Sequence, residues 1–119
     1  MSSYVMINGK IHPAEEAHIP ALDRGFLYGD CIYEVFAARS GVLIDFERHM
    51  ARLRRSAQNH EILVPWTDEV IKFDLDHLLA NHPYEYAHFR LVISLTGNNE
   101  YNFARRPIVS STGFAFARR

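Results

Sequence analysis

Residues 23–57 read DRGFLYGDCIYEVFAARSGVLIDFERHMARLRRSA, and this stretch decides the fold that we expect for the chain. Its first part, Asp23–Asp30, contains two glycines and predicts a structured loop. Cys31–Arg39 is nearly all apolar or aromatic, which favours a strand covered on both faces. A serine–glycine pair then turns the chain, so Val42–Ile44 is expected to return as the second arm of a hairpin.

The strand predicted over Cys31–Arg39 divides its side chains between two faces, because the side-chain period of a strand is two residues. One face carries Ile32, Glu34, Phe36 and Ala38, and the other carries Tyr33, Val35, Ala37 and Arg39. Tyr33 is therefore expected on the opposite face from Glu34.

An arginine-rich helix is predicted directly after this hairpin. Asp45 is a suitable N-cap, because its carboxylate can accept a hydrogen bond from a free backbone N–H of the first turn. The core-facing residues follow the helical period, and they are Phe46, Met50, Leu53 and Ala57. A different face of the helix carries His49, Arg52 and Ser56.

The rest of the chain predicts a second helix and further strands. Thr67 can cap this helix, which runs to about residue 80 with Ile71, Leu75, Leu78 and Leu79 inward. Strands are predicted over Tyr4–Ile7, Lys10–His12, His88–Leu95 and Gly113–Arg119, with a short one near Ala17–Ile19 and a long polar loop over Gly97–Pro107. Because strands outnumber helices and do not alternate with them, we expect an α+β fold, a largely antiparallel sheet with two helices packed on it.

Length and composition indicate a single domain, residues 1–119. The formal net charge of -1 argues against a general nucleic-acid binder. There is no long uncharged apolar run, so no membrane span is expected, and the N-terminus lacks the features of a secretory signal. A single cysteine, Cys31, excludes an intrachain disulfide and fits a reducing, cytoplasmic compartment. The seven histidines lack metal-ligand spacing, so no metal site is expected.

Three polar side chains are candidates for a binding site. Tyr33 and Arg90 lie on otherwise apolar strand surfaces, and Arg52 lies on the arginine-rich helix. With the glycine-containing loop, they could line a site for a phosphate or carboxylate group. Each also has a structural interpretation: Tyr33 could be a core tyrosine and Arg52 part of a solvated helix face. Arg90 could pair with Glu34 or Glu85.

A set of short motifs in residues 23–57 resembles the N-terminal signature of the fold-type IV (class IV) pyridoxal-phosphate enzymes. In order, the motifs are Asp23-Arg24-Gly25, Tyr28-Gly29-Asp30, Tyr33-Glu34 and His49-Met50-Ala51-Arg52-Leu53. The family includes D-amino-acid aminotransferases, branched-chain aminotransferases and aminodeoxychorismate lyases. The resemblance implies the small N-terminal α+β domain of an aminotransferase that uses pyridoxal 5'-phosphate (PLP), with an amino acid and a 2-oxo acid as substrates. It also implies a homodimer.

The resemblance implies a role for each of four residues. Arg52 would bind the cofactor phosphate, and Tyr33 would face the cofactor and the substrate. Tyr28 would lie near the active site and, in the branched-chain members, reach toward the partner subunit. Arg90 would bind substrate with Tyr28 and could match an arginine in a Tyr-x-Arg strand of the branched-chain members, with His88 replacing that tyrosine.

Three departures from the family pattern limit what the chain is expected to do. Cys31 stands where the family usually has glycine or serine. The turn that contains a carboxylate-binding arginine in the D-amino-acid branch reads Leu95-Thr96-Gly97-Asn98. The lysine that forms the Schiff base belongs to the family's C-terminal domain, and neither Lys10 nor Lys72 matches it. We therefore expect that domain to be absent, no catalytic residue in this chain, and no transamination by these 119 residues alone.

Two other functions stay open. An aminodeoxychorismate lyase is the nearest alternative within the family, although Tyr33-Glu34-Val35 favours the aminotransferases. The alternative from another class is a non-catalytic anion-binding or interaction domain, which would use Arg48, Arg52, Arg54 and Arg55.

Overall fold

The computed structural model describes residues 4–7, 9–81, 85–94 and 108–113, the last of these for the backbone only. Six antiparallel strands form one sheet in the order β2-β1-β6-β5-β3-β4. The strands are β1 (Tyr4–Ile7), β2 (Lys10–Pro13), β3 (Cys31–Arg39), β4 (Val42–Ile44), β5 (Tyr86–Ser94) and β6 (Ile108–Gly113). The helices are the 3-10 turn η1 (Ala14–Glu16), α1 (Arg24–Tyr28), α2 (Phe46–Asn59) and α3 (Asp68–Ala80).

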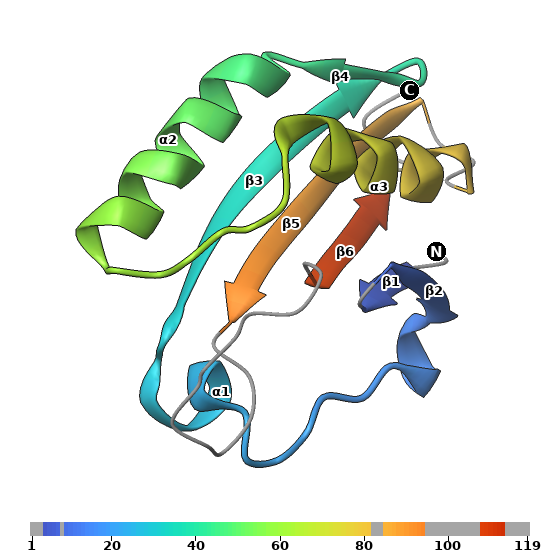
Figure 1. The fold of residues 1–119 in the computed structure, drawn as a ribbon. Helices are drawn as coiled ribbons and strands as arrows, with labels where there is room; N and C mark the ends of the chain where they lie inside the picture. The colour runs from blue at the N-terminus through green and yellow to red at the C-terminus, as the bar shows by residue number, and fades with distance from the viewer. Residues whose placement is uncertain (1–3, 8, 82–84, 95–107, 114–119) are drawn as a thin grey trace.

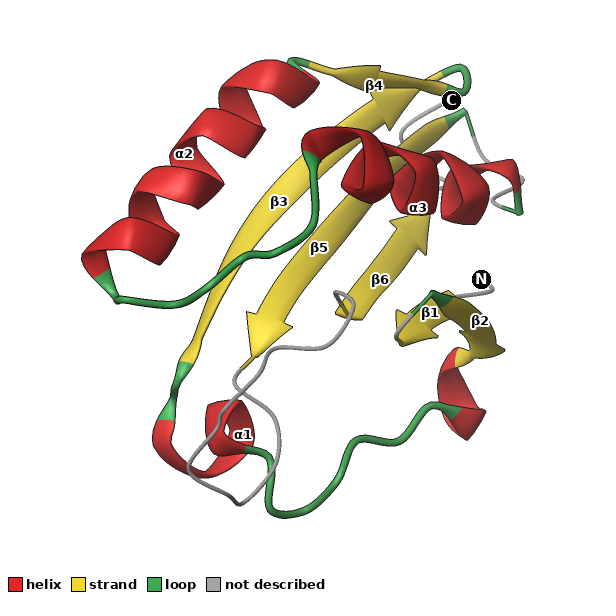
Figure 2. Ribbon diagram, viewed as in Figure 1, coloured by secondary structure: helices red, strands yellow, loops and turns green. Residues whose placement is uncertain are grey.

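The two longer helices lie on the same side of the sheet (Figure 1). Figure 2 shows the strands as one layer with α2 and α3 in front of it. This is the predicted α+β fold, with its sheet antiparallel throughout the described residues.

β3 and β5 are paired along their full nine-residue lengths, from Cys31 and Ser94 to Arg39 and Tyr86. Their buried side chains are Ile32, Glu34, Phe36, Ala38, Ala87, Phe89, Leu91 and Ile93, with Ser94 at the end of β5. The other face is open, since Tyr33 and Val35 are exposed. The prediction that β3 is covered on both faces is therefore wrong, because both helices pack on one side and an antiparallel sheet can leave its other face uncovered.

The two helices begin differently, although a cap-type residue precedes each. Thr67 caps α3 as predicted, since its hydroxyl accepts a 3.2 Å hydrogen bond from the backbone N–H of Val70. Asp45 precedes α2 in a left-handed conformation, φ 53°, and accepts no capping hydrogen bond, so the predicted side-chain cap is wrong. The core-facing residues of both helices are buried as predicted, and α3 also buries Asp74.

The connection from β2 to β3 differs from its prediction. Residues 17–19 form no strand, and the glycine-containing loop folds into the short helix α1. The Asp23 carboxylate caps α1, accepting hydrogen bonds from the Phe26 N–H at 3.0 Å and the Ser94 hydroxyl at 2.6 Å. Gly25 lies against Ser94, where an added Cβ would overlap the hydroxyl oxygen. These contacts hold α1 at the end of β5.

β6 joins the two halves of the sheet, because it pairs with both β1 and β5. The strand predicted over Gly113–Arg119 shares only Gly113 with β6, and residues 108–112 of β6 were not predicted as a strand. Residues 114–119 and the loop predicted over Gly97–Pro107 lie outside the described residues.

Candidate functional site

Glu34 is a buried carboxylate where β3 meets α2. Its side chain is 4% exposed and lies on the helix-facing side of β3, among apolar residues. Arg52 donates from Nε to Glu34 Oε1 at 3.0 Å, and its Nη2 also bonds the carboxylate. His49, three residues earlier on α2, places Nδ1 2.5 Å from Glu34 Oε2. A buried charge is costly unless it is paired, and here one helix face supplies both partners.

The pKa of Glu34 results from burial opposed by these partners. Burial is the largest single influence and acts to raise the pKa of the carboxyl. The hydrogen bonds and charges of Arg52 and His49 together outweigh burial, so the pKa of Glu34 lies below its ordinary value. The hydrogen bond and charge of Glu34 in turn raise the pKa of the Arg52 guanidinium. Glu34 and Arg52 are therefore an ion pair at neutral pH.

Arg52 is anchored on one side of its guanidinium and open on the other. Its side chain is 60% exposed although Nε and Nη2 bond Glu34. No described residue bonds Nη1, so part of the guanidinium remains available to another anion. The alternative of a merely solvated helix face is therefore wrong for Arg52. An exposed, planar guanidinium held in place by a carboxylate is well suited to phosphate.

Tyr33 and Arg52 line the same pocket, although they come from different elements. The pocket has a volume of about 260 Å³, and its lining residues are Tyr33, Glu34, Val35, Arg52 and Ser56. Tyr33 is 57% exposed, so the alternative of a core tyrosine is wrong. The pocket thus offers a guanidinium and a hydroxyl from α2 beside an aromatic ring from β3.

Arg90 of β5 lies over the ring of Tyr33, with its guanidinium carbon 4.9 Å from the ring centroid. A cation over the face of a tyrosine ring is an attractive arrangement. Arg90 does not pair with Glu34, because Glu34 points to the helices and Arg90 lies on the open face with Tyr33. In the described part of the chain, Glu85 accepts a hydrogen bond from Ser40 rather than from Arg90.

Tyr28 ends α1 and lies outside this pocket. Its side chain is 72% exposed, and the guanidinium carbon of Arg24 is 5.9 Å from its ring centroid. Arg24 is in turn bound to Asp30 at 2.9 Å. α1 lies where β3 begins and β5 ends (Figure 1). The structure therefore brings Arg52 and Arg90 together around Tyr33 and leaves Tyr28, the fourth predicted site residue, apart.

Glu34 and His49 contact Arg52 in the candidate site, although they were not among the site residues predicted from the sequence. One signal was present, because Glu34 is the only charged residue on the helix-facing side of Cys31–Arg39. A charge on a buried face requires a partner. The sequence did not identify the partners of Glu34, because His49 and Arg52 are 15 and 18 residues away in the chain.

Cys31 lies near two carboxylates at the start of β3. Burial, together with the charges of Asp23 and Asp30, raises the pKa of its thiol, so the thiol stays protonated and unreactive at neutral pH. Across residues 4–7, 9–81 and 85–94, no cluster of His, Cys, Asp and Glu side chains could hold a metal ion. No helix in the part of the chain that the structure describes has the length and apolar character to cross a membrane.

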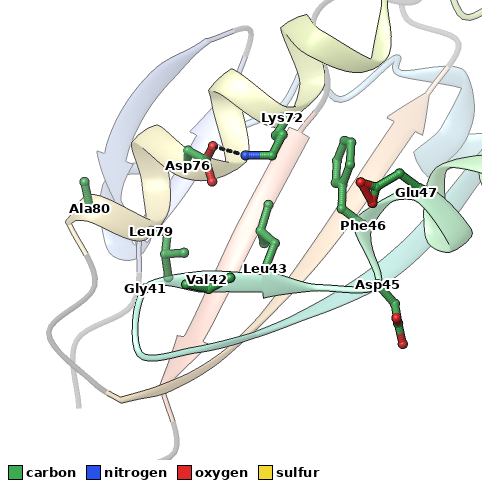
Figure 3. Close-up of a pocket in the computed structure, with 10 residues that line it drawn as sticks. All are labelled: Gly41, Val42, Leu43, Asp45, Phe46, Glu47, Lys72, Asp76, Leu79 and Ala80. Carbon is green, nitrogen blue, oxygen red and sulfur yellow. Dashed lines mark hydrogen bonds and ion pairs between the residues drawn. The ribbon is translucent and has the colours of Figure 1, made fainter.

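A larger pocket lies between β4 and α3 (Figure 3). Its volume is about 440 Å³, and its lining residues are Gly41, Val42, Leu43, Asp45, Phe46, Glu47, Lys72, Asp76, Leu79 and Ala80. The Lys72 ammonium bonds Asp76 at 2.7 Å across one turn of α3. The pocket contains none of the four predicted site residues, and its lysine is held in an exposed ion pair.

Comparisons with known proteins support one family. The family model for amino-transferase class IV matches residues 31–116. A D-alanine aminotransferase of Listeria innocua is 30% identical over 78 residues, covering 66% of this chain and 27% of the relative. A Methanocaldococcus jannaschii protein, named provisionally as a branched-chain-amino-acid aminotransferase, is 34% identical over 91 residues, covering 76% of this chain and 31% of the relative.

The fold comparison agrees with this grouping. The crystal structure of a branched-chain aminotransferase from Thermoproteus uzoniensis with norvaline matches with a TM-score of 0.75 at 21% identity, over 94% of this chain and 40% of that one. The PLP-bound form of a hypothetical aminotransferase from Mycobacterium tuberculosis matches with a TM-score of 0.76 at 19% identity, over 93% of this chain and 40% of that one. The chain spans less than a third of the length of the two curated relatives. Because the family model covers more than half of its residues, the chain belongs to the amino-transferase class IV family.

Proposed function

We propose that this chain forms the cofactor-phosphate-binding part of a PLP-dependent aminotransferase that moves an amino group between an amino acid and a 2-oxo acid. Family membership supports the reaction class. The names of the relatives, D-alanine and branched-chain aminotransferases, support the substrate class. The observation that carries the proposal is the single pocket lined by Tyr33 and Arg52, with Glu34 anchoring the arginine.

The residues of this pocket fit the phosphate group of the cofactor. Arg52 retains donors for charge-assisted hydrogen bonds, which are strongest to phosphate and carboxylate oxygens. The Ser56 hydroxyl adds a second donor type, and the Tyr33 ring offers an apolar surface to an aromatic ligand. Glu34 is the one carboxylate among the lining residues, and its charge is balanced by Arg52, so an anion is not repelled.

Each residue then has a defined task. When bound, the cofactor supplies the electron sink for amino-group transfer. Arg52 binds the phosphate, and Glu34 with His49 fixes the direction of the guanidinium. Tyr33 lines the pocket and excludes water from one side of it. Arg90 lies over Tyr33 and offers its remaining donors to the substrate carboxylate.

The lysine of the reaction is proposed to lie outside these residues. Lys72 is held by Asp76 on α3, and Lys10 lies on β2 at the edge of the sheet, so neither reaches the Tyr33 pocket. A C-terminal domain would supply the lysine, and the 119-residue chain alone would not transfer amino groups. The complete enzyme would be a cytoplasmic homodimer in which the exposed Tyr28 reaches the partner's site.

Cofactor binding by an Arg52→Gln variant tests the phosphate role. We expect PLP to bind the wild-type chain about tenfold or more tightly than the variant, because the variant lacks a charge-assisted hydrogen bond to the phosphate. Pyridoxal, which has no phosphate, should bind both proteins equally. Isothermal titration calorimetry measures both affinities.

Arg39→Gln is the matched control for this experiment. Arg39 lies over the Tyr86 ring at 5.3 Å on the open face of the sheet, away from the pocket, so its loss should change PLP affinity less than about twofold. Equal affinity of wild type and Arg52→Gln for PLP would contradict the role of Arg52. Amino-group transfer by the 119-residue chain alone would contradict the proposed source of the lysine.

A further inference from the structure

A third pocket lies on the outer surface of α2. Its volume is about 330 Å³, and its lining residues are Asp45, Arg48, His49, Arg52 and Arg55. Arg52 is the one residue that this pocket shares with the Tyr33 pocket, so its side chain lies between the two. We call this third pocket the arginine pocket.

Three guanidinium groups of the arginine pocket lie on one helix face. Arg48, Arg52 and Arg55 are spaced at i, i+4 and i+7, which brings neighbouring side chains within about 5–6 Å at Cβ. Like charges at this spacing destabilise a helix unless a counter-charge is bound. The pocket therefore concentrates positive charge in a small volume.

The described residues neutralise this charge only in part. The Arg48 side chain is 85% exposed, and its nearest carboxylate oxygen, Asp45 Oδ2, is 3.9 Å away. Arg55 has no hydrogen bond or ion pair in the part of the chain that the structure describes. Among the three arginines and the described carboxylates, Arg52 alone has a close partner, Glu34.

Arg54, on the same helix, has its charge neutralised by a described carboxylate. It bonds Asp68 Oδ1 at 2.6 Å and the Trp66 carbonyl at 2.9 Å, and so ties α2 to the start of α3. Arg54 therefore serves the fold and does not belong to a free basic surface. Arg48 and Arg55, which line the pocket, differ from it, because Arg48 has only the 3.9 Å contact with Asp45 and Arg55 has no ion pair within the described residues.

We propose that the arginine pocket binds a tetrahedral oxyanion, either inorganic phosphate or a phosphate monoester, through Arg48 and Arg55. Planar guanidinium groups match tetrahedral oxyanions with paired hydrogen bonds, and several forks can share one anion. A cavity of about 330 Å³ has room for phosphate and a small organic group. Asp45 is 57% exposed and holds Arg48 only at 3.9 Å, so an anion replaces it as the partner of Arg48 without burying a charge.

This site is separate from the proposed cofactor role. The cofactor proposal uses Arg52 with Tyr33 on one side of the arginine side chain, and the present one uses Arg48 and Arg55 on the other. Either can fail while the other holds.

A phosphate titration followed by NMR tests the proposal on the 119-residue chain at low ionic strength. The Nε–Hε signals of Arg48 and Arg55 should shift together and saturate as inorganic phosphate is added. An Arg48→Gln/Arg55→Gln variant should bind phosphate about tenfold more weakly, since two charge-assisted contacts are lost. An Arg48→Lys/Arg55→Lys variant keeps the charge but not the planar fork, and should bind about threefold or more weakly.

The matched control removes the same charge elsewhere. Lys10→Gln/Arg39→Gln changes two exposed cations outside the pocket and should alter phosphate affinity by less than about twofold. A parallel loss of affinity in this control would show general charge attraction and overturn the proposal. So would wild-type affinity in the Arg48→Gln/Arg55→Gln variant, or wild-type affinity in the lysine variant.

Two further titrations, with PLP and with pyridoxal, distinguish free phosphate from a phosphate monoester as the ligand. They also distinguish this proposal from the cofactor proposal. If PLP shifts the Nε–Hε signals of Arg48 and Arg55 and pyridoxal does not, the pocket binds phosphate monoesters. If only inorganic phosphate shifts these signals, the ligand is free phosphate. Shifts confined to Tyr33 and Ser56 on adding either phosphate compound would overturn the arginine pocket while leaving the cofactor proposal intact.

Discussion

Glu34 holds the candidate site together, because its buried carboxylate fixes the guanidinium of Arg52. Its pKa is lowered in the folded chain, so the ionised carboxylate stabilises the fold. This contribution to stability is fully present when the pH is above 4.5, the ordinary pKa of a glutamate. It is lost as the pH falls through the lower pKa that Glu34 has in the folded chain. The stability that depends on Glu34 is therefore present at neutral pH and disappears in acid.

Glu34→Gln should lower the melting temperature by about 5 °C or more at pH 7, because the amide leaves Arg52 without a counter-charge and His49 without its carboxylate partner. The difference between wild type and variant should narrow as the pH falls below 4.5. Thermal unfolding followed by circular dichroism between pH 7 and pH 3 measures it. Glu47→Gln, the same change at an exposed position of α2, should shift the melting temperature by less than about 2 °C. A difference for Glu34→Gln that stays constant with pH would argue against this assignment.

Among the elements, α2 and α3 show that the same type of flanking residue can act differently. Thr67 makes a capping hydrogen bond, whereas Asp45 adopts a positive φ and makes none. The chain reaches α2 directly from the short strand β4, and this tight connection demands the left-handed conformation at Asp45. A position at φ 53° favours glycine, so Asp45 is strained where Thr67 is not.

Thr67→Ala should therefore destabilise the chain by about 1 kcal/mol, through the lost N-cap. Asp45→Gly should change the free energy of unfolding by less than about 0.5 kcal/mol or raise it, because no cap is lost and the backbone strain is relieved. Urea denaturation of the two variants gives both values. A larger loss for Asp45→Gly than for Thr67→Ala would mean that Asp45 caps α2 after all.

For the molecule as a whole, the dominant feature is a sheet with one covered face. Leu91 is fully buried on the helix-facing side of β5, whereas its neighbour Val92 is half-buried on the open side. The core therefore lies between the sheet and the pair α2 and α3. Among the described residues, the open face carries Tyr33 and Arg90 and no helix packs on it.

This arrangement predicts unequal costs for two adjacent substitutions. Leu91→Ala should destabilise the 119-residue chain by about 3 kcal/mol, because it removes a fully buried side chain and leaves a cavity. Val92→Ala should cost less than about 1 kcal/mol, since its side chain is already in partial contact with water. Chemical denaturation of the two variants measures their free energies of unfolding. Equal losses would mean that the open face is covered.

The candidate site could be predicted only in part from the sequence. The motif residues Tyr33, Arg52 and Arg90 do gather at one place, whereas Tyr28 stays on α1. The ion-pair partner of Glu34 could not be predicted from the sequence, because the chain contains several arginines. Which of them pairs with Glu34 depends on which face of the sheet packs against α2. The helix α1 could not be told from a loop, because five residues that include a glycine are too short to show a helical period.

The sequence by itself determined the order of the longer elements from β1 to β5, the core stripes of α2 and α3 and the two hairpins, but not the short helix α1. These features depend on side-chain period and turn chemistry, which act over a few residues. Only the tertiary structure decided that one sheet face stays open, and that Glu34 meets His49 and Arg52. The alternation of a strand separates its two faces but does not say which of them a helix will cover. Which face is covered depends on how segments that are distant in the chain pack together. The position of the candidate site depends on the same packing.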